Sequence, residues 1–276
     1  MRSRKIGENF GVEFYDIDVS RITDQELQRA REAQNENGVI FFRNQNLSCE
    51  QHIEFAKRWG EIEVNRFFER VDGYEEIAMV RKEPHHKTVV GENWHTDHSY
   101  DIEPAKGSIL YSREIPTKGG DTKFVNMYLA YETLQQETQE KIGSLEALHS
   151  SRHVFSEEAV QDIEPGEDRF HSADQAVQDS IHPMVITHPE SGKKALYVNP
   201  GFTVSVVGLD NEESEQLLNQ LYDHTLKPEN MIRFKWQKNC IAFWDNRATW
   251  HQADNDYPTE RRVMHRITLK GCPLSR

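Results

Sequence analysis

The stretch KGSILYSREIPTKGGDTKFVNM, residues 106–127, contains two short runs rich in β-branched and aromatic residues, separated by a proline and two glycines. Such runs between turn-forming residues are typical of β-strands. Similar runs occur at residues 38–45 and 76–83, and towards the C-terminus at residues 230–253 and 261–271. Few helices and many short strands predict a mainly β fold with flanking helices (α+β), in which a barrel or sandwich carries the helices on its outside.

Four segments have the apolar spacing expected for helices. They are residues 23–34, 47–62, 130–145 and 211–224. In the second segment Ser48 is a suitable N-cap, and Gln51, three residues later, completes a capping box. In the same segment the side chains of Ile53 and Ala56, with Phe55 or Trp59, are expected to face the core.

One long segment lacks such a pattern. Residues 156–180 are polar and acidic, although both neighbouring segments have clear apolar patterns. We expect this part of the chain to form a mobile excursion or lid. No internal repeat, low-complexity tract or linker divides the rest, and the sequence predicts a single domain over residues 1–276.

The composition excludes some classes of partner. The chain has 33 basic and 46 acidic residues and a net charge of −13, whereas a nucleic-acid surface needs clustered positive charge. Its three cysteines are far apart and form no CxxC pair, so neither a disulfide framework nor a thiolate zinc site is indicated. No apolar run approaches 18 residues, and the N-terminus lacks the apolar core of a signal peptide. We therefore expect a soluble, cytoplasmic protein without nucleic-acid or membrane partners.

A candidate metal site begins in NWHTDHSY, residues 93–100. If this stretch is a strand, His95 and Asp97 point to the same face and reach one point. The candidate third ligand is His251, which follows a β-rich run far along the chain. Two histidines and one carboxylate leave positions open on an octahedral ion, as in non-haem Fe(II) oxygenases. A His-x-Asp pair alone is more often two alternating polar residues than a metal site.

A candidate anion site lies beyond His251. ERRVMHRITLKG, residues 260–271, concentrates basic residues in an acidic chain. Arg262 and Arg266 are four apart, so a strand places both on one face, and a turn after His251 would bring them back on the neighbouring strand. A buried arginine needs an anion, and its planar fork matches a carboxylate. The alternative is a solvated edge strand of alternating charge.

Several motifs, taken in order, resemble a known family. They are NWHTDHSY (residues 93–100), SILYSREIPTKGGDTKFVNMYLAYETL (residues 108–134), WDNRATWHQADNDY (residues 244–257) and RRVMHRITLKG (residues 261–271). Together they resemble the taurine dioxygenase group of Fe(II)- and 2-oxoglutarate-dependent oxygenases, which includes enzymes that attack phenoxyacetate herbicides and alkyl sulfates. The likeness runs from about residue 6 to residue 271, nearly the whole chain.

The resemblance implies a double-stranded β-helix (jelly-roll, cupin-like) core and a set of site residues. It implies His95, Asp97 and His251 as the iron ligands. It also implies that Arg262 and the Thr122 hydroxyl bind the distal carboxylate of 2-oxoglutarate. Arg266 would lie between this co-substrate and an anionic substrate, and Trp244 would lie close to the iron or belong only to the core.

The activity that the resemblance implies is hydroxylation. Iron, dioxygen and 2-oxoglutarate would oxidise an unactivated C–H bond of a small organic substrate, while 2-oxoglutarate leaves as succinate and carbon dioxide. Desaturation or cyclisation by the same cofactors remains an alternative. A sensor that binds iron or 2-oxoglutarate without turnover is another, as is a zinc hydrolase, although the sequence singles out no general base for one. Relatives commonly form dimers or tetramers, and we expect a homo-oligomer.

The predicted substrate contacts differ from those of taurine enzymes. At the places where those enzymes use a histidine, a tyrosine and an asparagine, an alignment with at least one gap puts Asn65, Phe68 and Gly91. Taurine is therefore not the expected substrate, although Arg266 still favours an anionic one. Further contacts are expected from YVNPGFT, residues 197–203, with Asn199 and Phe202 in the pocket wall.

Overall fold

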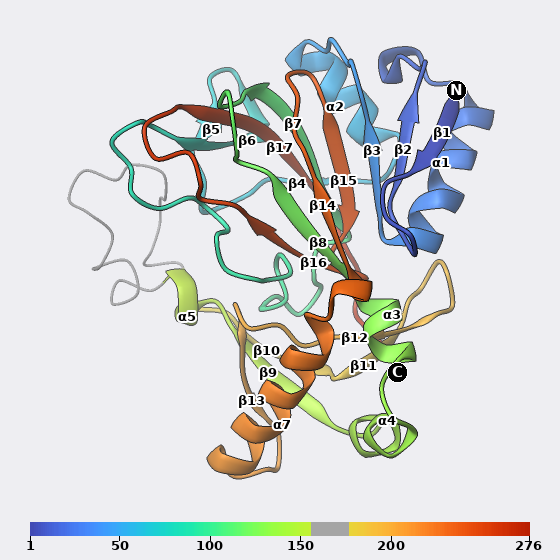
Figure 1. Ribbon diagram of the computed structural model, residues 1–276, viewed down its shortest axis with the longest axis vertical. Helices are drawn as coiled ribbons and strands as arrows, with labels where there is room; N and C mark the ends of the chain where they lie inside the picture. The colour runs from blue at the N-terminus through green and yellow to red at the C-terminus, as the bar shows by residue number, and fades with distance from the viewer. Residues whose placement is uncertain (156–176) are drawn as a thin grey trace.

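The computed structural model describes residues 1–155 and 177–276, and two facing β-sheets form its centre (Figure 1). The large sheet has nine strands in the order β1-β2-β3-β15-β7-β17-β6-β5, with β4 paired to β17. Their bounds are β1 (Arg2–Lys5), β2 (Val12–Tyr15), β3 (Val39–Phe42), β4 (Ile62–Glu63), β5 (Arg70–Val71), β6 (Tyr74–Lys82), β7 (Gly107–Glu114), β15 (Ile241–Asp245) and β17 (Arg262–Leu269). The facing sheet has the order β14-β8-β16, with β8 (Thr122–Asn126), β14 (Met231–Phe234) and β16 (Thr249–Ala253).

Helices and two small sheets surround this centre. The small sheets are β10-β9-β13 and β11-β12, with β9 (Glu146–Ser150), β10 (Asp179–Pro183), β11 (Val185–Thr187), β12 (Lys194–Leu196) and β13 (Thr203–Val206). The helices are α1 (Asp24–Asn37), α2 (Cys49–Lys57), α3 (Met127–Glu132), α4 (Gln136–Ile142), α5 (Arg152–Phe155) and α7 (Asn211–Thr225), with 3-10 turns η1 (Val19–Arg21) and η3 (Pro228–Asn230). In Figure 1, α1 and α2 lie beside the large sheet, and α3, α4 and α7 lie at the end that carries the small sheets.

The central strands β3 and β15 are buried on both faces, which is why their sequences are largely apolar runs. In β3, Phe41 packs between the two sheets and Phe42 packs under α1 and α2. In β15, Trp244 likewise packs between the two sheets, and Phe243 packs on the helical side with Phe42. This two-residue period fixes which side chains enter the space between the sheets.

Local sequence signals place the helix ends. The α1 helix begins after the N-cap Thr23, in a capping box with Glu26, and ends at Gly38, whose φ of 76° suits glycine. The α2 helix begins after Ser48, in the predicted capping box with Gln51. The mainly β fold with flanking helices is thereby confirmed.

Three sequence predictions are wrong in detail. Residues 130–145 form no single helix: α3 begins earlier, capped by Asn126, and a non-helical stretch at Thr133–Gln135 separates it from α4. NWHTDHSY is no strand: only His95 makes an isolated β-bridge, with His251, and a turn follows in which His98 has a φ of 60°. The strand that carries Arg262 belongs to the opposite sheet from His251 and is not its neighbour. The predicted lid at 156–180 lies mostly outside the described residues, and its last two residues begin β10.

Candidate active site

The two histidines of the predicted metal site are held together by backbone hydrogen bonds. The His95 N–H donates to the His251 carbonyl at 3.2 Å, and the His251 N–H donates to the His95 carbonyl at 2.9 Å. Their ring centroids are 4.1 Å apart. In β16, His251 pairs with Phe124 of β8 and stacks on its ring, so its imidazole enters the space between the sheets.

Asp97 reaches the same point from the turn after His95. One carboxylate oxygen lies 3.6 Å from His95 Nε2, and the other lies 3.8 Å from His251 Nε2. Candidate ligand atoms of these three residues all lie within 4.8 Å of one another. The structure therefore brings together His95, Asp97 and His251, although a turn replaces the predicted strand.

The protonation states suit a divalent cation. Burial opposes ionisation of Asp97, but the Arg266 guanidinium holds the pKa of its carboxyl well below its usual range. Burial holds the pKa of His251 well below its usual range, so this imidazole is neutral. A contact of 2.7 Å between His95 Nδ1 and the Asn93 carbonyl requires a proton on Nδ1, which leaves the Nε2 lone pair for a metal.

Two groups hold the Asp97 carboxylate. The Ser108 hydroxyl donates to one oxygen at 3.0 Å, and Arg266 lies 3.2 Å from the other. Ser108 belongs to β7 and Arg266 to β17, so the large sheet fixes the carboxylate from one side. Two histidines and a carboxylate, all buried or nearly so, are a donor set that Fe(II) accepts.

The turn between β15 and β16 anchors the His95–Asp97 segment. The Thr96 hydroxyl lies 2.6 Å from the Asn246 carbonyl and 2.8 Å from the Thr249 carbonyl. The Asn246 side chain donates to Ala105 O and accepts from the Trp244 indole N–H. The residue between the two candidate ligands is thus tied to the strand that carries the third.

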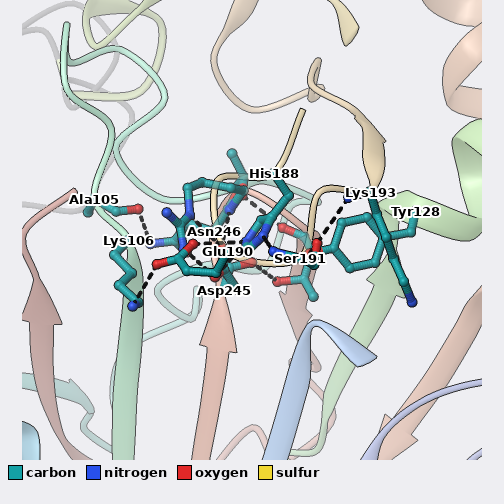
Figure 2. Close-up of polar contacts among 12 residues, drawn as sticks. Ala105, Lys106, Tyr128, His188, Glu190, Ser191, Lys193, Asp245 and Asn246 are labelled. Atoms are coloured by element: carbon teal, nitrogen blue, oxygen red, sulfur yellow. Dashed lines mark hydrogen bonds and ion pairs between the residues drawn. The ribbon is translucent and has the colours of Figure 1, made fainter. Parts of the chain in front are cut away.

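An ion-pair network with a buried centre lies next to this turn (Figure 2). Asp245 binds Arg247 at 2.7 Å and accepts from His188 at 3.0 Å, and all three side chains are buried. Glu190 pairs with Arg247 and Lys106, each at 2.8 Å. The Arg247 guanidinium holds the pKa of the Asp245 carboxyl far below its usual range, against the effect of burial.

Within residues 1–155 and 177–276, two further groups have metal-ligand composition. In the group of His188, Glu190 and Asp245, the cations Arg247 and Lys106 already pair with the carboxylates. In the group of Glu63, His98 and Asp101, Arg66 binds the Asp101 carboxylate. These two groups are therefore accounted for as structural ion pairs. The group of His95, Asp97 and His251 is the candidate metal centre.

Arg262 is a buried cation with unused donors. It shares the inward face of β17 with Met264, which packs between the sheets. Its side chain is buried, and its Nε and Nη2 have no hydrogen-bond partner among the described residues. Burial lowers the pKa of its guanidinium. A buried cation without a partner is destabilising, and an anion bound there would compensate its charge.

Thr122 and Arg266 flank the same space. Thr122, on the inward face of β8 with Phe124, accepts a hydrogen bond of 2.9 Å from the Trp236 indole. Arg266 lies one strand repeat beyond Met264, is buried, and has no partner for its Nε in the described part of the chain. Its guanidinium lies 5.6 Å from the Phe68 ring centroid. Both predicted arginines therefore face the interior, as their four-residue spacing requires.

The predicted substrate residues divide into two kinds. Phe202 lies edge-on to His95 at 6.1 Å, and Trp244 lies 4.5 Å from His251. Gly91 is so close that a Cβ there would lie 3.0 Å from the His95 ring. With Phe68 above Arg266, these residues surround the candidate metal centre.

The two predicted asparagines, Asn65 and Asn199, have hydrogen-bond partners within the protein. Asn65 accepts from the N–H groups of Phe67 and Phe68, and its Nδ2 lies 3.3 Å from His98 Nε2. Asn199 accepts from Phe202 N–H and donates to the Ser99 hydroxyl at 3.0 Å. These amides hold the turns that place Phe68 and Phe202 beside the site.

Sequence reasoning missed Ser108, Asn246 and Trp236. Ser108 stands at an inward position of the apolar run SILY, where a hydroxyl needs a buried partner. Trp236 lies two residues after Phe234, and alternate residues of a strand share a face, so the sequence could have predicted that both side chains point inward. Each of the three also has a partner in another segment of the chain, namely Asp97, Ala105 and Thr122, which the spacing along the chain does not reveal.

Comparison with known proteins gives a consistent result. The family model described as taurine catabolism dioxygenase TauD, TfdA family, matches residues 2–268. The chain belongs to this family. An alkylsulfatase of Acinetobacter baylyi is 33% identical over 275 residues, which cover 98% of this chain and 85% of that protein. An alpha-ketoglutarate-dependent sulfate ester dioxygenase of Pseudomonas putida is 34% identical over 236 residues, covering 84% and 77%.

A solved taurine dioxygenase of Burkholderia xenovorans has a TM-score of 0.82 and 33% identity, and the match covers 98% of this chain and 90% of that one. This likeness confirms the predicted jelly-roll core. Family membership makes the protein a dioxygenase that depends on 2-oxoglutarate (alpha-ketoglutarate) and acts with dioxygen on small molecules, and it implies iron. None of the described helices is both long and apolar enough to span a bilayer.

Proposed function

We propose that this dioxygenase holds Fe(II) with His95, Asp97 and His251 and hydroxylates a C–H bond of a small organic anion. The proposal for the metal is supported by the meeting of three candidate ligands within 4.8 Å. It is also supported by the Asn93 carbonyl, which fixes the His95 tautomer with Nε2 unprotonated. Iron, when bound, supplies the activation of dioxygen that converts 2-oxoglutarate to succinate and carbon dioxide and oxidises the substrate.

Arg262 and Thr122 would bind the distal carboxylate of 2-oxoglutarate. The observation that carries this assignment is the pair of unused nitrogens on the buried Arg262 side chain. A planar guanidinium can donate two parallel hydrogen bonds to one carboxylate, and a hydroxyl can add a third. The protein then contributes position and a shielded space between the two sheets.

Arg266 would face both the co-substrate and the substrate. It already compensates the charge of Asp97 at 3.2 Å, and its Nε is available among the described residues. An anionic substrate group near Arg266 would place the rest of the molecule against Phe68 and Phe202. Relatives that act on alkyl sulfates and sulfate esters fit this combination of a cation and aromatic rings. We therefore propose a sulfate ester, or a sulfonate or carboxylate of similar shape, rather than taurine.

The test is substrate-dependent oxygen consumption with Fe(II) and 2-oxoglutarate, together with succinate formation. The panel contains medium-chain alkyl sulfates, alkyl sulfonates, phenoxyalkanoates and taurine, with the corresponding uncharged alcohols as matched controls. Turnover with one of the anions and not with its alcohol is the expected result. Faster turnover of taurine or of the alcohols would contradict the proposed substrate class.

A glycine beside His95 provides a test of the metal site. A Cβ at Gly201 would lie 2.7 Å from the His95 Cβ, so Gly201→Ala must displace one of the two segments. Overpacking of this kind costs about 1–3 kcal/mol. We expect Gly201→Ala to bind Fe(II) several-fold more weakly and to unfold at a lower temperature. Unchanged Fe(II) affinity, measured by titration under anaerobic conditions, would contradict His95 as a ligand.

Gly60 provides the control for that variant. A Cβ at Gly60 meets no atom within 4 Å, and its backbone φ is not positive. Gly60→Ala should therefore leave both Fe(II) affinity and unfolding temperature unchanged. A loss in Gly60→Ala equal to that in Gly201→Ala would mean that the contact with His95 is not the cause.

The assembly state and the cellular location stay predictions. We expect a dimer or tetramer, which light scattering during gel filtration would measure. A cytoplasmic location is likewise a prediction, which cell fractionation would test.

A further inference from the structure

Trp236 contacts both residues that would bind the distal carboxylate of 2-oxoglutarate. It lies two residues beyond β14 and is buried. Its Nε1–H donates to Thr122 Oγ1 at 2.9 Å, and its ring centroid lies 5.8 Å from the Arg262 guanidinium carbon. The ring is fixed in turn by an edge-on contact with Phe234 at 4.9 Å.

The chemistry of the hydrogen bond sets the direction of the Thr122 hydroxyl. An indole nitrogen is only a donor, so Thr122 Oγ1 must accept in this contact. A hydroxyl has one proton and two lone pairs, and occupation of a lone pair by Trp236 restricts where the proton can point. Among the described residues no acceptor takes the Thr122 proton, and the nearby Arg262 offers only donors.

We infer that Trp236 is a positioning residue for the co-substrate, because its indole N–H turns the Thr122 hydroxyl proton towards the distal carboxylate of 2-oxoglutarate. The inference rests on the proposed function, since it needs that carboxylate beside Arg262 and Thr122. It assigns Trp236 a role through Thr122 and not through contact with the reacting atoms. The residue would thus help to select a co-substrate that carries a second carboxylate.

A purely structural role for Trp236 leads to different measurements. If the ring served only to fill the core, loss of the N–H in Trp236→Phe would weaken every 2-oxo acid alike or none. If the N–H orients Thr122, only acids with a distal carboxylate are weakened. 2-Oxovalerate separates the two cases, because it has a methyl group where 2-oxoglutarate has its distal carboxylate.

The experiment is calorimetric titration of the Mn(II)-loaded protein with 2-oxoglutarate and with 2-oxovalerate, without turnover. The variants are Trp236→Phe, Thr122→Val and the double variant, with Thr122→Ser as the variant that keeps the hydroxyl. We expect Trp236→Phe to raise the Kd of 2-oxoglutarate about three- to tenfold, the range of one hydrogen bond, and to leave that of 2-oxovalerate unchanged. Thr122→Val should act similarly, and the double variant should be no weaker than Thr122→Val alone.

The outcomes separate this inference from the function on which it rests. Failure of the wild-type protein to bind 2-oxoglutarate would overturn both. Normal binding by the wild-type protein with an unchanged Kd in Trp236→Phe, or additive effects in the double variant, would overturn only the inference. Should Trp236→Phe not fold, the indole N–H resonance of Trp236 in the metal-free protein provides the test. It should shift in Thr122→Val and not in Thr122→Ser, and an unshifted resonance in Thr122→Val would overturn the inference.

Discussion

Arg262→Met should raise the Michaelis constant for 2-oxoglutarate well over tenfold. The substitution keeps most of the side-chain volume but removes the only buried charge whose Nε and Nη2 both lack partners among the described residues. Truncating one partner of a buried, hydrogen-bonded charge pair costs roughly 2–5 kcal/mol. The loss should fall on co-substrate binding, since Arg262 touches neither Asp97 nor the two histidines through any hydrogen bond or ion pair in the described part of the chain.

The stability of Arg262→Met can also be predicted for the protein without 2-oxoglutarate. An unpaired buried cation destabilises the fold, so Arg262→Met should leave the free energy of unfolding unchanged or increase it. With saturating 2-oxoglutarate the wild-type protein should have the higher free energy of unfolding, because only the wild-type protein binds the co-substrate tightly. Chemical denaturation with and without the co-substrate gives both values.

Arg261 is the matched control for Arg262. It is the preceding residue, but its side chain is 41% exposed and binds Glu83 and Glu114 at the surface. Arg261→Met removes the same charge from the same strand end and should change the Michaelis constant for 2-oxoglutarate by less than about twofold, since exposed ion pairs contribute little. Equal effects of the two variants, or none from Arg262→Met, would mean that the co-substrate binds elsewhere.

The three residues named from the sequence for a metal site meet in the structure, whereas the strand predicted to carry two of them is a turn. His95 and Asp97 were expected to converge because alternate strand residues share a face. They converge in fact through a bridge to His251 and a turn in which His98 has a positive φ. Residue types and their order along the chain indicated the site, whereas the turn depends on Thr96 and its contacts with Asn246 and Thr249, which lie some 150 residues away.

Strand periodicity succeeded where a segment was long and apolar. Arg262 and Arg266 share a face with Met264 because β17 is a regular strand of eight residues. Their relation to His251 was predicted wrongly, because a chain that leaves β16 crosses to the opposite sheet instead of returning beside it. Sequence spacing gives the length of a connection but not the sheet that the next strand joins.

The sequence did not show which polar side chains have hydrogen-bond partners nearby in the chain and which have partners in distant segments. Asn65 and Asn199, which are predicted to contact substrate, also accept hydrogen bonds from backbone groups two or three residues ahead. This local bonding is common for asparagine in turns and leaves no mark in a single sequence. Ser108 and Trp236 act at long range, and their partners depend on how two sheets face each other.

Asp97→Ala should abolish turnover. Loss of a group that only orients a metal ligand costs about 10- to 100-fold in metal affinity or activity. Asp97 is itself a candidate ligand, so its loss should lower turnover by more than about 100-fold. Fe(II) affinity should fall together with succinate formation. The variant also leaves Arg266 without the carboxylate that lies 3.2 Å away, and loss of one partner of a buried pair costs about 3–5 kcal/mol, so unfolding should occur at a lower denaturant concentration.

Asp101→Asn separates loss of the metal from loss of a buried ion pair. Asp101 is four residues along the same turn, is largely buried, and pairs with Arg66 and His98 in another group of metal-ligand composition. Its replacement should lower the free energy of unfolding but leave Fe(II) affinity within about twofold, because the exchange of a paired carboxylate for an amide does not alter the groups that face His95 and His251.

If Asp101→Asn lost Fe(II) and Asp97→Ala retained it, the metal would belong to the group of Glu63, His98 and Asp101. The assignment of Asp97 would then be wrong. Loss of iron in Asp97→Ala alone, in protein that circular dichroism shows to be folded, is the result that the geometry around His95 and His251 requires.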